Sequence, residues 1–279
     1  MRIIPRGPGK LRTLVEPRVL QYEDVGEGSP IVLVPGALTG WHSWAPHQKR
    51  LSATRRAIRV QPIHNELGSA GRPGDLSYTW ETERESLRLT VDALELDTAD
   101  FAGWSGGGRA MIEFTLQYPD RVRSLTLVEP AAYWVLEELG QRDEQVERLD
   151  GFIRSIAGRD VSDDELGQFL ELAAFIRPGE DARQHPNWER WAPHKQALSW
   201  QQMVDRSERS LEDLGRIACP VLLVKGTVTA NWLKRVVDVL AERIPGATVL
   251  ELEGDHASHI QSIDAFLEAL ETHLAGARR

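Results

Sequence analysis

The hydrophobic residues of this chain form short continuous runs that alternate with longer amphipathic stretches. Residues 31–34 are wholly apolar and residues 122–128 are rich in Val and Leu, which is typical of strands buried on both faces of a sheet. The stretch 79–94 instead carries Leu87, Val91 and Leu94 on one side and charges on the other, which predicts an amphipathic helix. This pattern predicts strands at 18–24, 31–34, 56–60, 98–102, 122–128, 221–224 and 247–252, helices at 44–54, 79–94, 106–118, 230–242 and 259–274, and a loop at 61–77.

Strands that alternate with helices predict an α/β fold, with a mostly parallel central sheet and helices on both faces. The alternation stops between residues 131 and 214, where the segments are helical, charged and broken by prolines. We therefore predict a core formed by residues 1–130 and 215–279, with a helical cap inserted at 131–214. Residues 1–17 contain three prolines and are expected to form an irregular or strand-bearing arm.

Composition and charge limit the kinds of molecule that this chain is expected to bind. The 279 residues suit one large domain or a core with an insertion, and the net charge of −9 argues against binding nucleic acid or an anionic membrane. The single cysteine, Cys219, excludes an intrachain disulfide. Neither a signal peptide nor a membrane-spanning stretch is recognisable. We expect a cytoplasmic protein that acts on a small molecule, and the sequence does not predict its oligomeric state.

The segment Gly103-Trp104-Ser105-Gly106-Gly107 carries the pattern G-x-S-x-G. A predicted strand precedes it and a predicted helix follows, which is the context of a nucleophile elbow. The serine at such a turn is strained, so its neighbours must be small. The following helix directs its N-terminal N–H groups at the serine, where negative charge develops during acyl transfer. The alternative is a glycine-rich turn without catalytic function.

A serine nucleophile needs a base, and the base needs an acid that orients it. His256 lies in the loop after the last predicted strand, where its imidazole can reach Ser105, and we predict it to be the base. His259 lies at the start of the last helix and is expected to be structural or to line the pocket. The histidines lack the spacing of metal ligands and no dinucleotide-binding fingerprint is present, so no cofactor or metal is expected.

The G-x-S-x-G segment, the Pro35-Gly36 turn after a buried strand and Gly254-Asp255-His256 together resemble the α/β-hydrolase fold family over essentially the whole chain. The order of serine before histidine is that of the family. The resemblance implies an orienting Asp after the strand at 221–224, but Thr229 occupies that position. Some members carry the acid at the end of the preceding core strand, which here is Glu129. We assign Glu129 as the acid, the alternative being a carboxylate in a local ion pair.

Two other carboxylates fit the role of the acid less well. Asp255 is adjacent to His256, and adjacent side chains rarely meet in the required geometry. Asp238 is expected to face solvent from a helix. The resemblance also implies that the backbone N–H groups of Ala37 and Gly106 bind the oxyanion, with Leu38 as the alternative loop donor.

Tryptophans are frequent near the predicted site, and aromatic walls suit an apolar or aromatic substrate. We predict substrate contacts from Trp104, Leu38, Trp41 and Trp134. The alternative is that the tryptophans join the cap to the core.

These residues predict a serine hydrolase that cleaves a small ester, thioester or lactone through an acyl-enzyme on Ser105. A serine, unlike an aspartate, does not support the alkyl-enzyme chemistry of dehalogenases and epoxide hydrolases. Two alternatives remain open. One is a C–C bond hydrolase, a lyase or a cofactor-free oxidative enzyme that uses the same residues. The other is a catalytically silent ligand-binding protein, which the missing Asp suggests.

Overall fold

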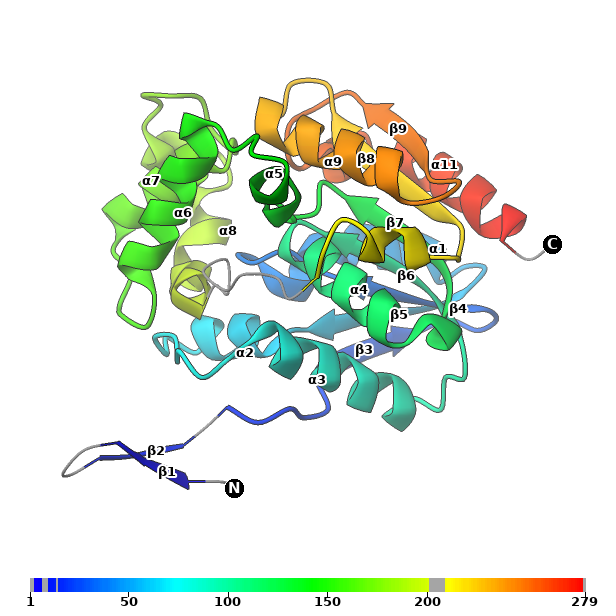
Figure 1. Cartoon of the computed structure of the whole chain (residues 1–279), viewed down its shortest axis with the longest axis horizontal. Coiled ribbons are helices and arrows are strands. Elements are labelled where there is room, and N and C mark those ends of the chain that lie inside the picture. The colour runs from blue at the N-terminus through cyan, green and yellow to red at the C-terminus, as the bar shows by residue number, and fades with distance from the viewer. Residues whose placement is uncertain (1–2, 7–9, 14, 201–208, 278–279) are drawn as a thin grey trace.

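The computed structural model describes residues 3–6, 10–13, 15–200 and 209–277 (Figure 1). Its largest sheet has the strand order β3-β5-β4-β6-β7-β8-β9. Only the β3–β5 pair is antiparallel, and every other pair is parallel. The predicted mostly parallel sheet is therefore confirmed. Its strands are β3 (Gln21–Val25), β4 (Pro30–Val34), β5 (Arg56–Gln61), β6 (Ala99–Trp104), β7 (Val122–Val128), β8 (Val221–Gly226) and β9 (Thr248–Leu252).

Helices cover both faces of this sheet, which is why its central strands carry apolar residues on both faces. Along β4, Ile31 and Leu33 join one hydrophobic cluster, whereas Val32 and Val34 join the other. The first cluster contains residues of α1 (Ala45–Leu51) and α11 (Ile263–Gly276). The second contains residues of α3 (Trp80–Ala93), α4 (Gly106–Gln117) and α9 (Asn231–Arg243), which lie in front of the sheet in Figure 1.

Two local predictions are wrong. The stretch 61–77, predicted to be a loop, contains the helix α2 (Ile63–Ser69). This helix packs tightly against η4 (Ala192–Trp200), since a Cβ added to Gly68 would lie 2.3 Å from the Ala197 nitrogen. The closing helix predicted at 259–274 is divided into α10 (Ser258–Gln261) and α11, with Ser262 between them.

The segment between β7 and β8 corresponds to the predicted cap. Its described residues, 131–200 and 209–214, contain helices and no strand. Figure 1 shows α6, α7 and α8 gathered at one side of the sheet. The boundaries of the cap as a separate unit stay a prediction. The elements of this segment are α5 (Trp134–Glu138), α6 (Glu144–Ile156), α7 (Asp163–Leu172), η3 (Ala182–Gln184), α8 (Trp188–Trp191), η4 and η5 (Asp213–Arg216).

The remaining elements are short. Strands β1 (Ile3–Arg6) and β2 (Lys10–Thr13) pair antiparallel in a separate sheet within the predicted N-terminal arm. The 3₁₀ helices η1 (Gly40–Trp44) and η2 (Pro119–Arg121) precede α1 and β7. None of the helices in the described ranges is long and apolar enough to cross a membrane.

The register of the sheet brings the carboxyl ends of its strands to one edge. The end of β4 pairs with β6, that of β6 with β7, and that of β8 with β9, through Val34↔Gly103, Trp104↔Val128 and Gly226↔Leu252. Ligand sites of open α/β sheets lie at this edge. Ser105, Glu129 and the loop that carries His256 all follow directly from these strand ends.

Candidate active site

Ser105 adopts the strained backbone of a sharp turn, with φ 53° and ψ −118°. Hydrogen bonds on both sides hold it there. Its N–H donates to the Val128 carbonyl at 2.9 Å, and its own carbonyl accepts from the Ala131 N–H at 2.9 Å and from the Arg109 N–H at 3.1 Å. These bonds join the turn to the end of β7 and to α4. The surrounding structure thus holds Ser105 in a backbone conformation that a serine rarely adopts.

The glycines on either side of Ser105 are required by close backbone contacts. A Cβ on Gly103 would lie 2.7 Å from the Gly107 carbonyl oxygen, and one on Gly107 would lie 2.4 Å from the Val34 carbonyl oxygen. Real Cβ atoms do not approach backbone oxygens so closely. The two flanking glycines of the motif therefore let β6, α4 and β4 meet at the serine.

Glu129 is fully buried and also has a positive φ, 37°. Its Oε1 accepts a hydrogen bond from the Gly226 N–H at 2.6 Å. Its Oε2 accepts from the Thr229 hydroxyl at 2.9 Å and lies 2.6 Å from Nδ1 of His256. Three hydrogen-bond donors therefore surround this one buried carboxylate and hold it in place.

The contact with Glu129 determines which ring nitrogen of His256 carries the proton. An ionised carboxylate only accepts hydrogen bonds, so Nδ1 of His256 carries the proton and Nε2 is the acceptor. This is the tautomer that a general base requires. The hydroxyl of Ser105 has no hydrogen-bond partner among the described residues, and catalytic hydrogen bonds often tighten only when substrate binds.

Thr229 occupies the position at which the resemblance implies an aspartate. The structure gives this threonine a partner, because its hydroxyl donates to the Glu129 carboxylate and its side chain is buried. A second carboxylate at this point would face Glu129 directly. The threonine is therefore complementary to a glutamate that comes from the neighbouring strand end.

The loop of His256 is attached to two parts of the core. The Trp104 indole N–H donates to the His256 carbonyl at 2.8 Å. The Val228 N–H donates to the Gly254 carbonyl at 3.0 Å, which joins the loops after β8 and β9. Phe175 packs edge-on against the imidazole, with ring centroids 5.1 Å apart. These contacts hold the imidazole, which is 3% exposed, at the sheet edge.

The two carboxylates judged less suitable have other partners. Asp255 accepts from the Ala257 N–H and from the Gln261 side chain, both at 2.8 Å. Asp238 pairs with Lys225 at 2.8 Å. Neither bond involves the imidazole of His256.

His259 lies among buried aromatic rings below the site. It is fully buried and stacks on His47, with ring centroids 5.3 Å apart. It also contacts Trp44 and Trp104, each at 4.8 Å between centroids. Burial lowers the pKa of His47 to about 4 and holds the pKa of His259 well below its ordinary value. Both rings are thus neutral at pH 7, and of the two alternatives for His259 the structure favours the structural one.

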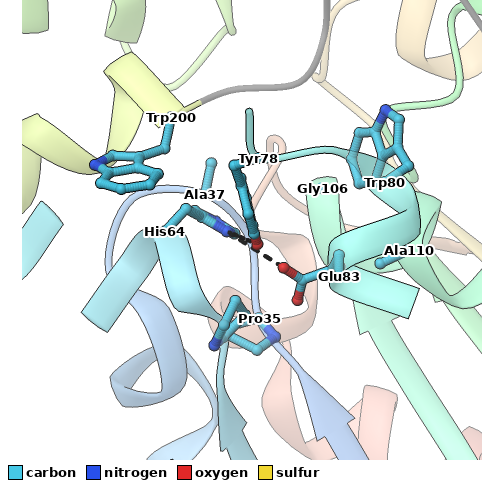
Figure 2. Close-up of a pocket in the computed structure, with 11 residues that line it drawn as sticks. Pro35, Ala37, His64, Tyr78, Trp80, Glu83, Gly106, Ala110 and Trp200 are labelled. Carbon is cyan, nitrogen blue, oxygen red and sulfur yellow. Dashed lines mark hydrogen bonds and ion pairs between the residues drawn. The ribbon is translucent and has the colours of Figure 1, made fainter. Parts of the chain in front are cut away.

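Two narrow pockets border the loop after β4, and Ala37 lines both. We call the first the aromatic pocket, which is lined by Gly36, Ala37, Leu38, Thr39, Trp104, Ser105, Phe169, Phe175 and Trp191. We call the second the Glu83 pocket, shown in Figure 2, which is lined by Pro35, Ala37, Pro62, His64, Tyr78, Trp80, Glu83, Gly106, Gly107, Ala110 and Trp200. Each has a volume of about 20 Å³, which is room for about one water molecule.

The structure brings some of the predicted binding residues together and not others. Trp104 and Leu38 line the aromatic pocket with Ser105. Trp41 lies in η1, where its backbone N–H donates to the Gln61 side chain, and Trp134 is buried in the hydrophobic core. Neither lines the aromatic pocket or the Glu83 pocket, so their contact with substrate stays a prediction.

The predicted oxyanion donors lie close to each other. A Cβ added to Gly106 would be 4.0 Å from the Ala37 nitrogen. Asn65 of α2, which is fully buried, donates to the Ala37 carbonyl at 2.6 Å and so holds the loop. Sequence reasoning missed Asn65 because it expected no helix there. It also missed Phe169 and Phe175, because the helical spacing of Leu166, Phe169 and Leu170 marks an apolar helix side but not its position beside Ser105.

Comparison with known proteins gives a consistent picture. A model described as "Alpha/beta hydrolase family" matches residues 31–269. The chain is 38% identical over 170 residues to 2-hydroxy-6-oxo-2,4-heptadienoate hydrolase from Pseudomonas putida, a match that spans 56% of this chain and 59% of that protein. It is 26% identical over 266 residues to pimeloyl-[acyl-carrier protein] methyl ester esterase from Aeromonas hydrophila, a match that spans 92% and 99% of the two chains.

A solved structure extends the comparison to the fold. Carboxylesterase CesB from Bacillus subtilis is similar to this chain with a TM-score of 0.70 at 18% identity, over 95% of this chain and 91% of that one. At this identity the likeness concerns the fold alone.

Proposed function

Because the chain belongs to the alpha/beta hydrolase family, we propose that it is a serine hydrolase that cleaves small carboxylic esters through an acyl-enzyme on Ser105. One observation carries this proposal. The buried Glu129 carboxylate lies 2.6 Å from Nδ1 of His256, at the same sheet edge as the strained Ser105 turn. A nucleophile, a base in the correct tautomer and an orienting acid are the parts that acyl transfer by serine requires.

The proposed reaction has two halves. In the first, Nε2 of His256 accepts the Ser105 hydroxyl proton while the oxygen attacks the carbonyl carbon. The imidazolium then gives that proton to the leaving alcohol as the C–O bond breaks. In the second, His256 deprotonates a water molecule, which attacks the acyl-enzyme and releases the acid and Ser105. Glu129 stabilises the imidazolium in both halves.

The oxyanion of each tetrahedral intermediate is assigned to the N–H groups of Ala37 and Gly106. Both residues border the Glu83 pocket, and Ala37 also borders the aromatic pocket that contains Ser105. The N–H of Gly106 lies at the start of α4, where the helix dipole adds to the attraction for negative charge. Such donors contribute roughly 10²- to 10³-fold to the rate of acyl transfer.

A fluorophosphonate probe tests the nucleophile. We expect the folded wild-type protein to be labelled on Ser105, as mapped by mass spectrometry of its peptides, and Ser105→Ala to remain unlabelled. Hydrolysis of para-nitrophenyl butyrate should disappear in the same variant. A folded wild-type protein that reacts with neither reagent would support the catalytically silent ligand-binding alternative.

A second candidate is hydrolysis of a C–C bond by the same residues. The 38% identity to 2-hydroxy-6-oxo-2,4-heptadienoate hydrolase favours it. The two candidates separate when purified protein is assayed with that dienoate, followed by its absorbance, and with para-nitrophenyl butyrate. We expect a higher kcat/KM for the ester. The reverse order would assign the C–C reaction.

A further inference from the structure

The Glu83 pocket contains a carboxylate that has no role in the proposed reaction. Glu83 projects from the first turns of α3 and is 2% exposed. Neither of its carboxylate oxygens has a hydrogen-bond partner among the described residues. A buried carboxylate without donors is costly, and natural structures keep such groups where they meet a ligand or a counter-charge.

Glu83 forms part of the wall of this pocket together with His64, Tyr78, Trp80 and Trp200. Figure 2 shows His64, Tyr78 and Glu83 converging, with Trp80 and Trp200 at the periphery. Nδ1 of His64 hydrogen-bonds to the Tyr78 hydroxyl at 3.2 Å and lies 3.8 Å from Glu83 Oε2, which is too far for a hydrogen bond.

The buried guanidinium of Arg109, which packs on Trp80, has contacts other than Glu83. Arg109 stacks on Trp80, with its Cζ 4.6 Å from the ring centroid, and its Nη2 lies 3.8 Å from Glu113 Oε1. Arg109 does not line the Glu83 pocket. The pocket therefore combines one carboxylate with the rings of Tyr78, Trp80 and Trp200, which is the environment that proteins use for ammonium groups.

The position of this pocket indicates which half of a substrate it receives. In the proposed function, on which this step depends, His256 gives its proton to the leaving group, so the leaving group lies on the His256 side. The ring of His256 packs against Trp104 and Phe175, which line the aromatic pocket and not the Glu83 pocket. The Glu83 pocket instead borders Ala37 and Gly106, so the proposed function leaves this side for the acyl group.

We propose that Glu83 binds a protonated primary amine at the end of the acyl group, so that the preferred substrates are esters of small amino acids with a terminal amine. The pocket volume of about 20 Å³ suits one ammonium group in place of a water molecule. The ammonium donates to Glu83 and lies beside the aromatic rings. The alcohol lies on the side of the aromatic pocket, next to His256.

Two para-nitrophenyl esters test this proposal directly. The ester of β-alanine and the ester of butyric acid differ only in an ammonium group in place of a methyl group. We expect the wild-type protein to prefer the β-alanine ester in kcat/KM by about tenfold or more, as for a hydrogen bond between two charged groups. In Glu83→Gln, which keeps the shape of the side chain, this preference should fall by about tenfold or more.

The same helix offers a matched control. Glu81 lies two residues earlier on α3, and its side chain is 75% exposed. Glu81→Gln removes the same charge from the chain and should keep the wild-type ratio within about twofold. A similar loss in both variants would assign the effect to net charge and overturn the subsite.

Failure of the subsite and failure of the proposed function give different results. If both esters are hydrolysed equally well, the amine subsite is wrong and the serine hydrolase stands. If neither ester is hydrolysed, calorimetric titration with ethylammonium chloride decides. Binding to the wild type that is lost in Glu83→Gln supports the subsite without the proposed reaction, and absence of binding overturns it.

Thermal unfolding distinguishes a binding role from a structural one. If Glu83 serves to bind a ligand, Glu83→Gln removes a buried carboxylate that has no hydrogen-bond donor among the described residues and should raise Tm in the absence of ligand. If instead Glu83 stabilises the fold by pairing with His64, the variant should have a lower Tm, and that result would contradict the proposal.

Discussion

Glu129 is the residue at which the candidate site departs from the common arrangement of its family. It lies directly after β7 with a positive φ, and this backbone turns its carboxylate toward the loops after β8 and β9. Its three donors are Gly226 at the end of β8, Thr229 in the loop after β8 and His256 in the loop after β9. Glu129 thus reaches the imidazole of His256 from the end of β7. An acid on the loop after β8 would come from the strand that lies between β7 and β9.

Replacement of this carboxylate tests its role. Glu129→Gln keeps the size of the side chain but can no longer stabilise an imidazolium, and its amide also permits the wrong tautomer of His256. We expect kcat for para-nitrophenyl butyrate to fall by about 10⁴-fold, as in other triads that lose their acid. Glu253→Gln, at an exposed position beside the same edge, is the control and should retain activity. Equal activity of Glu129→Gln and wild type would reassign the acid.

Thr229 provides the complementary test. Its hydroxyl lies 2.9 Å from Glu129 Oε2, so an aspartate at this position is close to the place where the acid is needed. We expect Thr229→Asp to restore part of the activity of Glu129→Gln when kcat is measured in the double variant. In the wild-type background the same substitution places two carboxylates together and should lower Tm. An unchanged rate in the double variant would argue against the geometric explanation.

At the candidate site, the sequence indicates which residues are candidates better than it indicates which residues they contact. The elbow pattern, chain order and strand ends were sufficient to single out Ser105, His256 and Glu129. The role of Thr229 was not predictable, because a hydroxyl that donates across two strand ends depends on tertiary structure. The sequence does contain a sign that Glu83 is buried. Glu83 lies four residues before Leu87 and therefore on the apolar side of its helix.

Among the elements, α2 holds the loop after β4, which carries the predicted oxyanion donor Ala37 and which we call the oxyanion loop. Asn65 from this helix donates to the Ala37 carbonyl at 2.6 Å, and Gly68 lets the helix approach Ala197 of η4. The predicted oxyanion loop is therefore held by a helix that in turn contacts the cap segment. A change in α2 should affect the rate more than the binding of substrate.

Asn65→Ala tests this positioning role. The variant loses the hydrogen bond to Ala37, so the loop N–H should be less well oriented toward the oxyanion. We expect kcat to fall by about tenfold, with a smaller change in KM, because the oxyanion forms only in the transition state. Asn231→Ala, at the exposed start of α9, serves as the control and should change neither. A rise in KM at constant kcat would instead assign Asn65 to ground-state binding.

The elements that the sequence predicts well are those whose pattern is strong and local. Strand β7 was predicted with its observed bounds, because a short stretch rich in Val, Leu and Thr between Pro119 and Pro130 has few alternatives. Helix α2 was missed because its composition, with Asn65, Gly68 and Ser69, is that of a loop, and its packing against η4 outweighs its low propensity. The break at Ser262 likewise depends on tertiary contacts, since its hydroxyl donates to the Glu253 carbonyl.

Across the whole molecule, a buried aromatic cluster connects the site to stability. His47 follows the start of α1, and His259 lies in α10. His47 donates from Nε2 to the His259 carbonyl at 3.0 Å, and their rings pack against Trp44 and Trp104. Trp104 in turn holds the loop of His256 through its indole N–H. A proton added to either histidine of this cluster therefore places charge directly beneath the candidate site.

The pH dependence of folding follows from the sign of these shifts. Burial lowers the pKa of His47 from 6.5 to about 4, and the charge of nearby Arg50 acts in the same direction. The pKa of His259 is held well below 6.5 by burial and by the neighbouring His47 and His256. The unfolded chain therefore binds protons that the folded chain does not, so stability is present above pH 6.5 and decreases as the pH falls below it.

The expected loss is large enough to measure by denaturant unfolding at a series of pH values. For His47 alone it reaches about 3 kcal/mol near pH 4, because each pKa unit corresponds to about 1.4 kcal/mol. His47→Gln keeps an N–H donor for the His259 carbonyl but does not titrate. Its free energy of unfolding should therefore depend less steeply on pH between 4 and 6.5, by about 1.4 kcal/mol per pH unit. His42→Gln, at an exposed position on η1, should retain the wild-type slope. Parallel curves for His47→Gln and the wild type would mean that the cluster takes up its protons without unfolding, and the link between this cluster and acid stability would be lost.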